Sequence, residues 1–243
     1  ALSKEDDVNL YYVKEGQEIG DADLILLPGS KNTTEDMLYL RDSGMEKALN
    51  EAHEKNIPII GICGGYQMLG RTISDPHGVE NENSLREPLR GMELIDTDTT
   101  LMPEKMRTQT RGKFENVTGI FSTLSGLEFS GYEIHMGKTT VSTGEHQTPL
   151  VQLADGRTDG VQRMEKGSEA PGVYGSYVHG IFDDGDIAVR IVQALADKKR
   201  VSWKPEAGGD YHAFKEQQYD KLAQGLREHL DMEYVYSILQ ESR

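Results

Sequence analysis

The chain has 243 residues, of which 36% are hydrophobic and 28% charged, a balance typical of one or two soluble globular domains. Its net charge of −15 disfavours a nucleic-acid partner, because phosphates are bound by Lys and Arg, and favours a role for the excess acid in solubility. No apolar run approaches the roughly 20 residues of a membrane span. The N-terminal segment lacks a signal-peptide core and the single cysteine cannot form an internal disulfide, so we expect a cytoplasmic protein with no membrane contact.

The first third of the chain predicts alternating strands and helices. Residues 8–13 and 23–29 are predicted to be short strands, and residues 33–56 a helix with Thr33 or Thr34 as its N-cap. Residues 57–63, an isoleucine-rich run bounded by Pro58, are predicted to be the next strand, and a further helix follows. This order indicates an α/β fold, an open and mostly parallel sheet with helices on both faces.

The middle of the chain is more β-like and less regular, and its end is helical. Residues 91–102, 112–122, 127–142 and 149–164 are β-like segments separated by Gly and Pro. Residues 213–239 have helical spacing, and an apolar stripe there is interpreted as a packing face formed by Tyr219, Leu222, Leu226 and Leu230. Because no repeat or convincing linker is visible, we expect a single domain over residues 1–243.

The only cysteine, Cys63, lies in Gly61-Ile62-Cys63-Gly64-Gly65, which has the form of a nucleophile elbow with Cys in place of Ser. A nucleophile at such a strand-to-helix turn has a strained backbone, and the residues two positions away on either side must be small. The N-terminus of the following helix is expected to favour the thiolate, and the Gly64 N–H to face a developing oxyanion. The alternative is a buried structural cysteine, which the glycines disfavour.

A cysteine nucleophile needs a base, and two of the seven histidines are candidates. His179 and His135 each lie in a strand-like stretch, and a histidine at the carboxyl end of such a strand faces the crevice of an open α/β sheet. Either could instead be a hydrogen-bonded core histidine. The other five are interpreted as residues of surface helices or polar loops, namely His53, His77, His146, His212 and His229.

Four segments in this order carry a family resemblance: "LPGSKNT", "GICGGYQMLG", "GYEIHMGKT" and "YGSYVHGIFD". Together they resemble the class I (triad-type) glutamine amidotransferase domains of the cobyric acid synthase family, and the similarity covers nearly the whole chain. The elbow alone would indicate only a class I glutamine amidotransferase. "GYEIHMGKT" together with "LPGSKNT" narrows the resemblance to the cobyric acid synthase branch.

The resemblance implies that this domain releases ammonia from glutamine. Cys63 would attack the side-chain amide and form a γ-glutamyl thioester, while His179 transfers protons. Backbone N–H groups of Gly29 and Gly64 would hold the oxyanion, and Gln67 and His135 match substrate-binding positions. Glutamine is thus the expected ligand of this domain, which needs no cofactor of its own. ATP and Mg²⁺ are expected in a synthetase domain that is not in this sequence, and a corrin substrate would bind through that domain.

The sequence departs from the common class I pattern at two places. Many such enzymes have a Glu two residues after the catalytic His, but here the residue is Ile181, which indicates a Cys–His dyad. The candidate acids for orienting His179 in its place are Glu133, Asp183 and Asp184. The family's domain also usually opens with an apolar strand before the region that matches "ALSKEDDVNL". Its absence predicts either a sheet one strand short or an apolar surface covered by another chain.

Several alternatives remain open from the sequence alone. "GYEIHMGKT" superficially resembles a phosphate-binding loop, but five residues rather than four separate its glycines, so we expect no nucleotide there. No cluster of Cys and His has ligand spacing, and residues 183–186 are expected to be a solvated turn, so no metal site is predicted. The elbow is also compatible with a hydrolase of another substrate class, similar to the PfpI/DJ-1 group. The missing Glu leaves open a non-catalytic interaction domain.

Overall fold

A computed structural model describes residues 2–4, 7–14, 16–80, 87–142, 146–164, 172–204 and 211–241. The helices are η1 (Leu2–Lys4), α1 (Thr33–Asp42), α2 (Met45–Glu54), α3 (Gly64–Leu69), η2 (Gly119–Leu124), α4 (Gly185–Lys199), α5 (Tyr211–His229) and α6 (Met232–Glu241). The strands are β1 (Ile25–Leu27), β2 (Ile59–Ile62), β3 (Thr72–Ser74), β4 (Leu89–Arg90), β5 (Thr97–Phe114), β6 (Glu128–Val141), β7 (Gln147–Leu153), β8 (Thr158–Arg163), β9 (Val173–Ser176) and β10 (Val178–His179).

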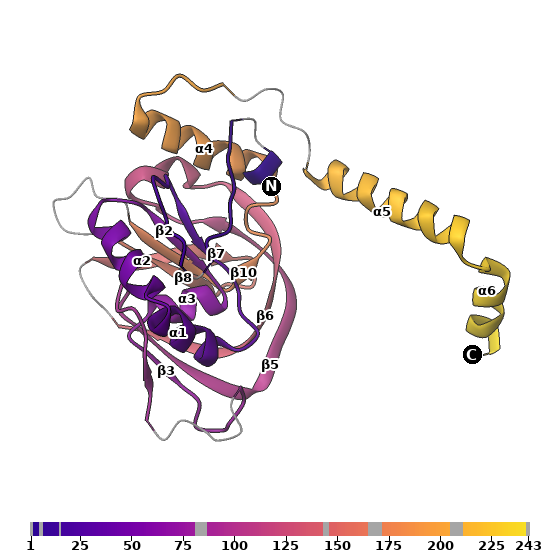
Figure 1. The fold of residues 1–243 in the computed structure, drawn as a ribbon, viewed down its shortest axis with the longest axis horizontal. Helices are drawn as coiled ribbons and strands as arrows, with labels where there is room; N and C mark the ends of the chain where they lie inside the picture. Colours follow the sequence, from indigo (N-terminus) through magenta and orange to yellow (C-terminus); the bar gives the residue numbers. More distant parts are fainter. Residues whose placement is uncertain are drawn as a thin grey trace.

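The strands form one open sheet in the order β1-β2-β9-β8-β7-β5-β3-β4, with β6 paired to β5 and β10 (Figure 1). Parallel pairing joins β1 to β2 and β2 to β9, as well as β3 to β5. Strands β5 to β8 are joined by antiparallel pairs (β5 with β6 and β7, and β7 with β8), and β6 also pairs with β10, the strand that contains His179. The expected open α/β sheet is confirmed, and its parallel strands β1, β2 and β9 lie where the predicted nucleophile is.

Helices cover both faces of the sheet, and adjacent residues of β2 are therefore buried on opposite sides of it. Ile59 packs in a cluster with Met37, Leu49 and Leu69 from α1, α2 and α3. Ile60 packs in a second cluster, which includes residues of η2 and α4 such as Phe121, Leu124, Ile187 and Ile191. Truncating a buried Ile such as Ile59 to Ala would cost about 2–5 kcal/mol. The two apolar layers therefore fix the height and tilt of β2, whose end carries Cys63.

Several sequence predictions are corrected near the N-terminus. Residues 8–13 form no strand; Tyr12 is exposed, and the Tyr11 hydroxyl donates a hydrogen bond to the Ile19 carbonyl. The predicted helix 33–56 is two helices, because Gly44 adopts a left-handed conformation (φ 78°) between α1 and α2. The N-cap of α1 is Asn32 rather than Thr33 or Thr34, because the Asn32 side chain accepts the hydrogen bond from Glu35 N–H.

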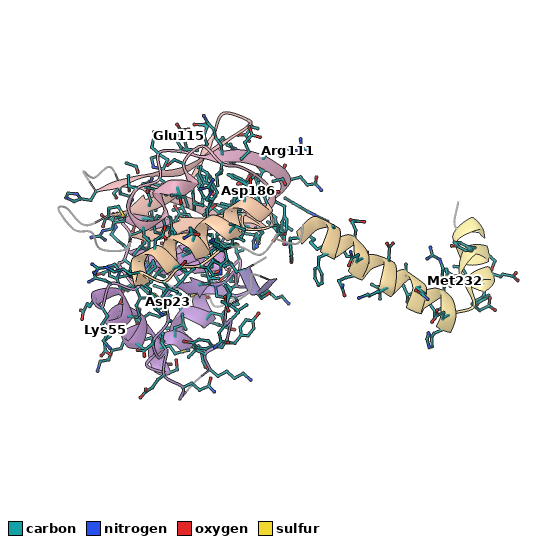
Figure 2. The ribbon with its side chains drawn as sticks, turned by 90° about the horizontal axis from the view of Figure 1, so that it is seen from above. Asp23, Lys55, Arg111, Glu115, Asp186 and Met232 are labelled. Atoms are coloured by element: carbon teal, nitrogen blue, oxygen red, sulfur yellow. The ribbon has the colours of Figure 1, made fainter. Side chains whose placement is uncertain are left out.

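The C-terminal helices extend away from the sheet (Figure 1). In Figure 2, Met232 at the start of α6 lies far from Asp23, Lys55, Arg111 and Glu115 on the body of the fold. The helical character predicted for residues 213–239 is confirmed, but as two helices, α5 and α6, which are separated by residues 230–231. The apolar stripe is not a packing face within this chain, since all four side chains are exposed: Tyr219, Leu222, Leu226 and Leu230. Among the described residues, no helix is long and apolar enough to cross a membrane.

Candidate active site at the end of strand β2

Cys63 occupies the turn between β2 and α3, as the sequence predicts. Its backbone has φ 53° and ψ −108°, a conformation that costs a residue with a side chain about 1–3 kcal/mol. Hydrogen bonds hold it there: Cys63 N–H donates to the Ser176 carbonyl at 2.9 Å, and the Cys63 carbonyl accepts from Gln67 N–H at 3.0 Å. Hydrogen bonds to strand β9 and to the first turn of α3 thus keep Cys63 in this strained backbone conformation.

The glycines around the thiol are required by close backbone approach. A Cβ atom on Gly61 would lie 2.8 Å from the carbonyl of Gly65, and one on Gly65 would collide with the Leu27 carbonyl at the end of β1. A Cβ atom on Gly64 would lie 2.7 Å from Cβ of Ser30. The predicted crowding two residues either side of the cysteine is confirmed. The same contacts press the start of α3 against the segment that follows β1.

The thiol is less exposed than the sequence suggests. Cys63 is only 6% exposed, and its Sγ lies 3.6 Å from the Ile134 carbonyl of β6, to which the thiol donates. Burial raises the pKa of the Cys63 thiol to about 11, although the Gly64 N–H acts in the opposite direction. The start of α3 favours the thiolate as expected, through the Gly64 N–H, but desolvation outweighs this single N–H and the net shift is upward. The resting group is a neutral thiol.

His179 lies beside Cys63 across Gly29. A Cβ atom on Gly29 would lie 3.0 Å from Cε1 of His179 and 3.5 Å from Cβ of Cys63, so both side chains border the same small space. Burial, followed by the nearby His135, lowers the pKa of His179, which keeps the imidazole neutral at pH 7. The structure thus brings together three residues that the sequence singled out: Cys63, His179 and Gly29.

Ile181 cannot orient His179, since its side chain is 2% exposed and packs in the core with α4. The three acids considered from the sequence are engaged elsewhere. Glu133 binds Arg157, Asp183 pairs with Lys215 at 3.3 Å, and the Asp184 carboxylate accepts from Ser130 N–H. Each of these acids has another partner, and no hydrogen bond joins the His179 ring to a carboxylate in the described part of the chain. This geometry agrees with a dyad.

Gln67 points from α3 into a buried polar cluster. Its amide nitrogen donates to the Tyr177 hydroxyl at 3.2 Å, and that hydroxyl also contacts Thr139 Oγ1 at 2.6 Å. The Gln67 carbonyl oxygen is buried and has no hydrogen-bond partner among the described residues. Leaving a buried acceptor unpaired costs about 1–3 kcal/mol, so this oxygen is an unsatisfied polar group close to the elbow.

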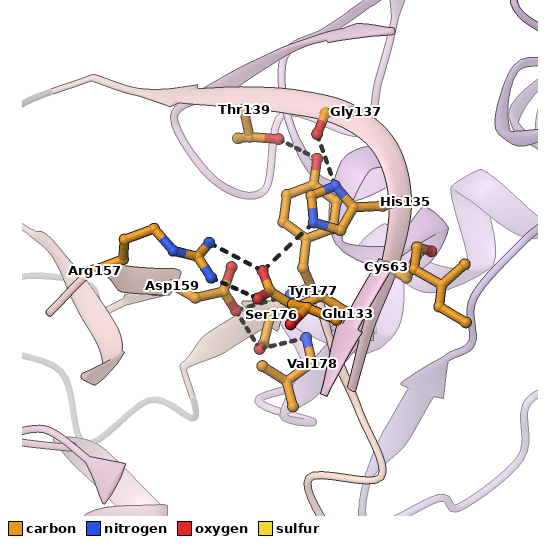
Figure 3. A network of polar contacts seen from close by, with 12 residues as sticks. Cys63, Glu133, His135, Gly137, Thr139, Arg157, Asp159, Ser176, Tyr177 and Val178 are labelled. Atoms are coloured by element: carbon orange, nitrogen blue, oxygen red, sulfur yellow. Dashed lines mark hydrogen bonds and ion pairs between the residues drawn. The ribbon is translucent and has the colours of Figure 1, made fainter. Parts of the chain in front are cut away.

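His135 stacks on Tyr177 and follows directly after Ile134, whose carbonyl contacts Cys63 Sγ. Its ring stacks on Tyr177 with centroids 3.8 Å apart, Nδ1 contacts the Gly137 carbonyl at 2.9 Å, and Nε2 lies 3.5 Å from Glu133 (Figure 3). Hydrogen bonding to His135 and to Arg157 lowers the pKa of Glu133 to about 2. His135 is therefore held by Tyr177, the Gly137 carbonyl and the neighbouring Glu133 carboxylate.

Asp159 is a site residue that the sequence analysis missed. The chain changes partners between β9 and β10, from β2 and β8 to β6, which leaves backbone N–H groups at the switch without a ladder partner. The Asp159 carboxylate accepts from Tyr177 N–H at 2.9 Å and Ser176 Oγ at 2.6 Å, and Ser176 Oγ accepts from Val178 N–H (Figure 3). This buried carboxylate thus holds the turn that leads into His179.

Glu80 is a second residue without a sequence signal. Its carboxylate accepts from Thr34 N–H and Thr33 Oγ1 at the start of α1, both at 3.1 Å. Burial raises the pKa of Glu80, and the Glu80 charge in turn contributes to the raised pKa of Cys63. Glu80 is therefore an acid on the α1 side of the thiol.

Cation ligands are not gathered at the acidic turn 183–186. Asp183 pairs with Lys215, and Asp184 accepts from Ser130 N–H, while Asp186 lies in the first turn of α4. Across the described residues, no group of three or more His, Cys, Asp or Glu side chains is arranged to hold a metal ion.

The fold and the site define a class: an α/β domain with a cysteine at a nucleophile elbow and a neutral histidine beside it. Among solved structures, the chain is similar to PurLQS from Thermotoga maritima, with a TM-score of 0.55 and 17% identity over 78% of this chain and 85% of that one. The likeness at this identity concerns the fold.

Sequence comparison places the chain more narrowly. The model of the CobB/CobQ-like glutamine amidotransferase domain matches residues 1–187, and the chain belongs to that family. It is 42% identical to a cobyric acid synthase of Ruminiclostridium cellulolyticum, over 99% of this chain and 46% of that protein. A cobyric acid synthase of Lachnoclostridium phytofermentans is 37% identical, over 99% of this chain and 47% of that protein. The chain spans about half the length of these curated relatives.

Proposed function

We propose that this domain hydrolyses glutamine to glutamate and ammonia, with Cys63 as the nucleophile and His179 as the general base. The observation that carries the proposal is that Cys63, at the end of β2, and the His179 imidazole both lie against the same point of Gly29. A thiol on a strained turn and a neutral histidine are the two groups that acyl transfer from an amide requires. Membership of the glutamine amidotransferase family supports glutamine as the amide.

The first half of the reaction forms a thioester. The Cys63 proton leaves its contact with the Ile134 carbonyl and passes to His179 as sulfur bonds to the amide carbon of glutamine. The amide oxygen becomes an oxyanion, for which Gly64 N–H and Gly29 N–H are the proposed donors. His179 then protonates the leaving nitrogen, the C–N bond breaks, and ammonia departs. A neutral thiol and a neutral imidazole are the correct starting states for this transfer.

The second half returns the enzyme to its resting state. Water gives a proton to His179 and attacks the γ-glutamyl thioester, the C–S bond breaks, and the sulfur regains its proton from the imidazolium. Glutamate leaves as the second product. One residue thus serves as base and acid in turn, which its lowered pKa allows because the protonated form returns its proton readily.

Gln67 and His135 are proposed to contribute to the glutamine pocket in different ways. The unpaired Gln67 carbonyl oxygen can accept a hydrogen bond from an amine or amide of the substrate. His135 acts through Tyr177, on which it stacks, and Tyr177 in turn binds the Gln67 amide. This arrangement supports a fixed orientation for the Gln67 side chain.

We further propose that the ammonia is used by a synthetase domain that binds ATP and Mg²⁺. That domain would amidate carboxylates of adenosylcobyrinic acid a,c-diamide to give adenosylcobyric acid in cobalamin biosynthesis. The names of the relatives and the share of their length outside this chain support the proposal. A cytoplasmic location is proposed with it, supported by the single free cysteine.

Glutamate release by the intact protein tests the glutaminase assignment. Cys63→Ser is expected to lower kcat by on the order of 10³-fold or more, and His179→Ala by about 10²–10⁴-fold. His77→Ala, which removes an exposed histidine from a turn, is the matched control and is expected to keep wild-type activity. Wild-type activity in the Cys63→Ser variant would refute the assignment.

A further inference from the structure

The imidazole of His179 is held in place without the carboxylate that usually orients a catalytic histidine. The nearby acids bind other groups, and the residue two positions on is the core residue Ile181. An imidazole that is free to turn about its Cβ–Cγ bond would be a poor base, because proton transfer requires a fixed direction. Some other contact must therefore limit that rotation.

Tyr132 provides such a contact from strand β6. His179 and Tyr132 are directly opposite in the antiparallel pair formed by β10 and β6. Their rings are parallel, with an interplanar angle of 6° and centroids 5.1 Å apart, which is an offset stack. On its edge the imidazole meets Gly29, where even a Cβ atom would lie 3.0 Å from Cε1. One face and one edge of the ring are thus defined.

We propose that Tyr132 is the positioning residue for His179 and takes the role that a carboxylate has in a triad. The aromatic face fixes the plane of the imidazole, while Gly29 sets how deeply it enters toward Cys63. The stack also shields one face of the ring from water, which contributes to keeping the imidazole neutral. The proposal rests on His179 being the base of the proposed glutaminase.

The pKa of His179 also depends on the charged and titratable groups around it, which a pH measurement must take into account. His135 is the nearby titratable group that acts on the pKa of His179, Cys63 borders Gly29 as His179 does, and Glu133 is paired with Arg157. On the α4 side, Asp183 is paired with Lys215 and Asp184 accepts a backbone N–H. Removing the Tyr132 ring leaves these groups unchanged and exposes the imidazole, so the pKa of His179 should rise.

Tyr132 can be replaced without emptying the core, since its side chain is 44% exposed. In the intact protein, Tyr132→Ala is expected to lower kcat for glutamine by at least about 10-fold with KM little changed, part of the 10²–10⁴-fold that a positioned base supplies. Its kcat/KM profile should have an acidic limb at higher pH than the wild type. Tyr132→Phe, which keeps the ring, should stay within about twofold of the wild type in both respects.

The control and a second measurement make the test decisive. Tyr39→Ala removes a tyrosine of similar exposure from α1 and should change neither kcat nor the pH profile. The pKa of His179, measured by NMR, should rise in Tyr132→Ala and not in Tyr132→Phe. An unchanged kcat in Tyr132→Ala would overturn the proposal, as would an unchanged His179 pKa in that variant or a loss in Tyr132→Phe as large as in Tyr132→Ala.

Failure of this proposal is distinguishable from failure of the proposed function. A wild-type protein that hydrolyses glutamine, together with a fully active Tyr132→Ala variant, refutes the role of Tyr132 alone. A wild-type protein that releases no glutamate refutes the glutaminase. In that case the NMR titration still tests whether Tyr132 controls the state of the imidazole.

Discussion

Replacing Gly65 by Ala tests whether the elbow is built on the close approach of α3 to β1. The added Cβ atom would collide with the Leu27 carbonyl, and it would lie 2.6 Å from the Leu27 carbonyl carbon and 2.9 Å from the Pro28 oxygen. These are backbone atoms, so no side-chain rotation can relieve the overlap. Either the end of β1 or the first turn of α3 must move.

The expected cost is at the upper end of the range for overpacking, about 3 kcal/mol, because backbone must shift. For a chain of this size that corresponds to a fall in Tm of roughly 6–12 °C. The displaced segment continues into Gly29, which borders both Cys63 and His179. Glutaminase activity per folded molecule should therefore fall as well, and more steeply than stability alone explains.

Thermal unfolding and a glutamate-release assay at a temperature where the variant is folded measure the two effects separately. Gly225→Ala is the matched control: nothing lies within 4 Å of its added Cβ atom, and within α5, one turn before its end, the change should stabilise the helix by up to about 0.5–1 kcal/mol. A Gly65→Ala protein with wild-type Tm and activity would refute the account of the elbow.

Three further predictions concern charge and hydrogen bonding at the site. Asp159→Ala should lower the free energy of unfolding by about 1–3 kcal/mol for each N–H or O–H left unpaired and should reduce kcat. Asp159→Asn keeps an acceptor and should retain most of the stability and of kcat, as measured by urea unfolding and glutamate release. Equal losses in the two variants would contradict the role of the acceptor. The pKa of Glu133 is lowered from 4.5 to about 2, so its contribution to the free energy of unfolding is complete above pH 4.5 and is lost as pH falls toward 2. The free energy of unfolding of Glu133→Gln should therefore fall less steeply over this pH range than that of the wild type. Identical acid-unfolding curves would contradict this contribution of Glu133. Because the pKa of the Cys63 thiol is raised to about 11, its alkylation by iodoacetamide without glutamine should still accelerate between pH 9 and 10, and a plateau near pH 8 would contradict the buried neutral thiol.

Local steric rules made the nucleophile predictable. The spacing of Gly61, Cys63 and Gly65 after an isoleucine-rich run has one economical explanation, the strained turn, and the structure contains it. His179 was predictable as a strand-end histidine, although its proximity to Cys63 depends on how both residues pack around Gly29. Sequence patterns only a few residues long were therefore enough to predict Cys63 and His179.

Features that depend on distant segments were not predictable in the same way. Asp159 has no motif, and its role appears only where the chain changes partners between β9 and β10. Tyr132 was visible within a motif, but its stacking on His179 depends on the register of β6 and β10. Burial of the thiol under the Ile134 carbonyl reversed the pKa shift expected from the start of α3.

Predictions of secondary structure likewise depended on whether local sequence or distant contacts decide the conformation. The strand predicted at residues 8–13 has β-forming side chains but no ladder partner, so its composition did not decide its conformation. Helix α4, for which the sequence analysis made no prediction, buries Ile187 and Ile191 against the face of the sheet opposite α1 to α3. Its apolar spacing was present in the sequence and could have predicted it.

Covalent labelling of Cys63 by a diazoketone analogue of glutamine tests the central claim most directly. Since Cys63 is the only cysteine, mass spectrometry of the intact protein and of its peptides can assign the adduct without a competing thiol. The account predicts one adduct on Cys63, suppressed by excess glutamine and much slower in His179→Ala. An unmodified Cys63, or labelling that glutamine does not suppress, would contradict it.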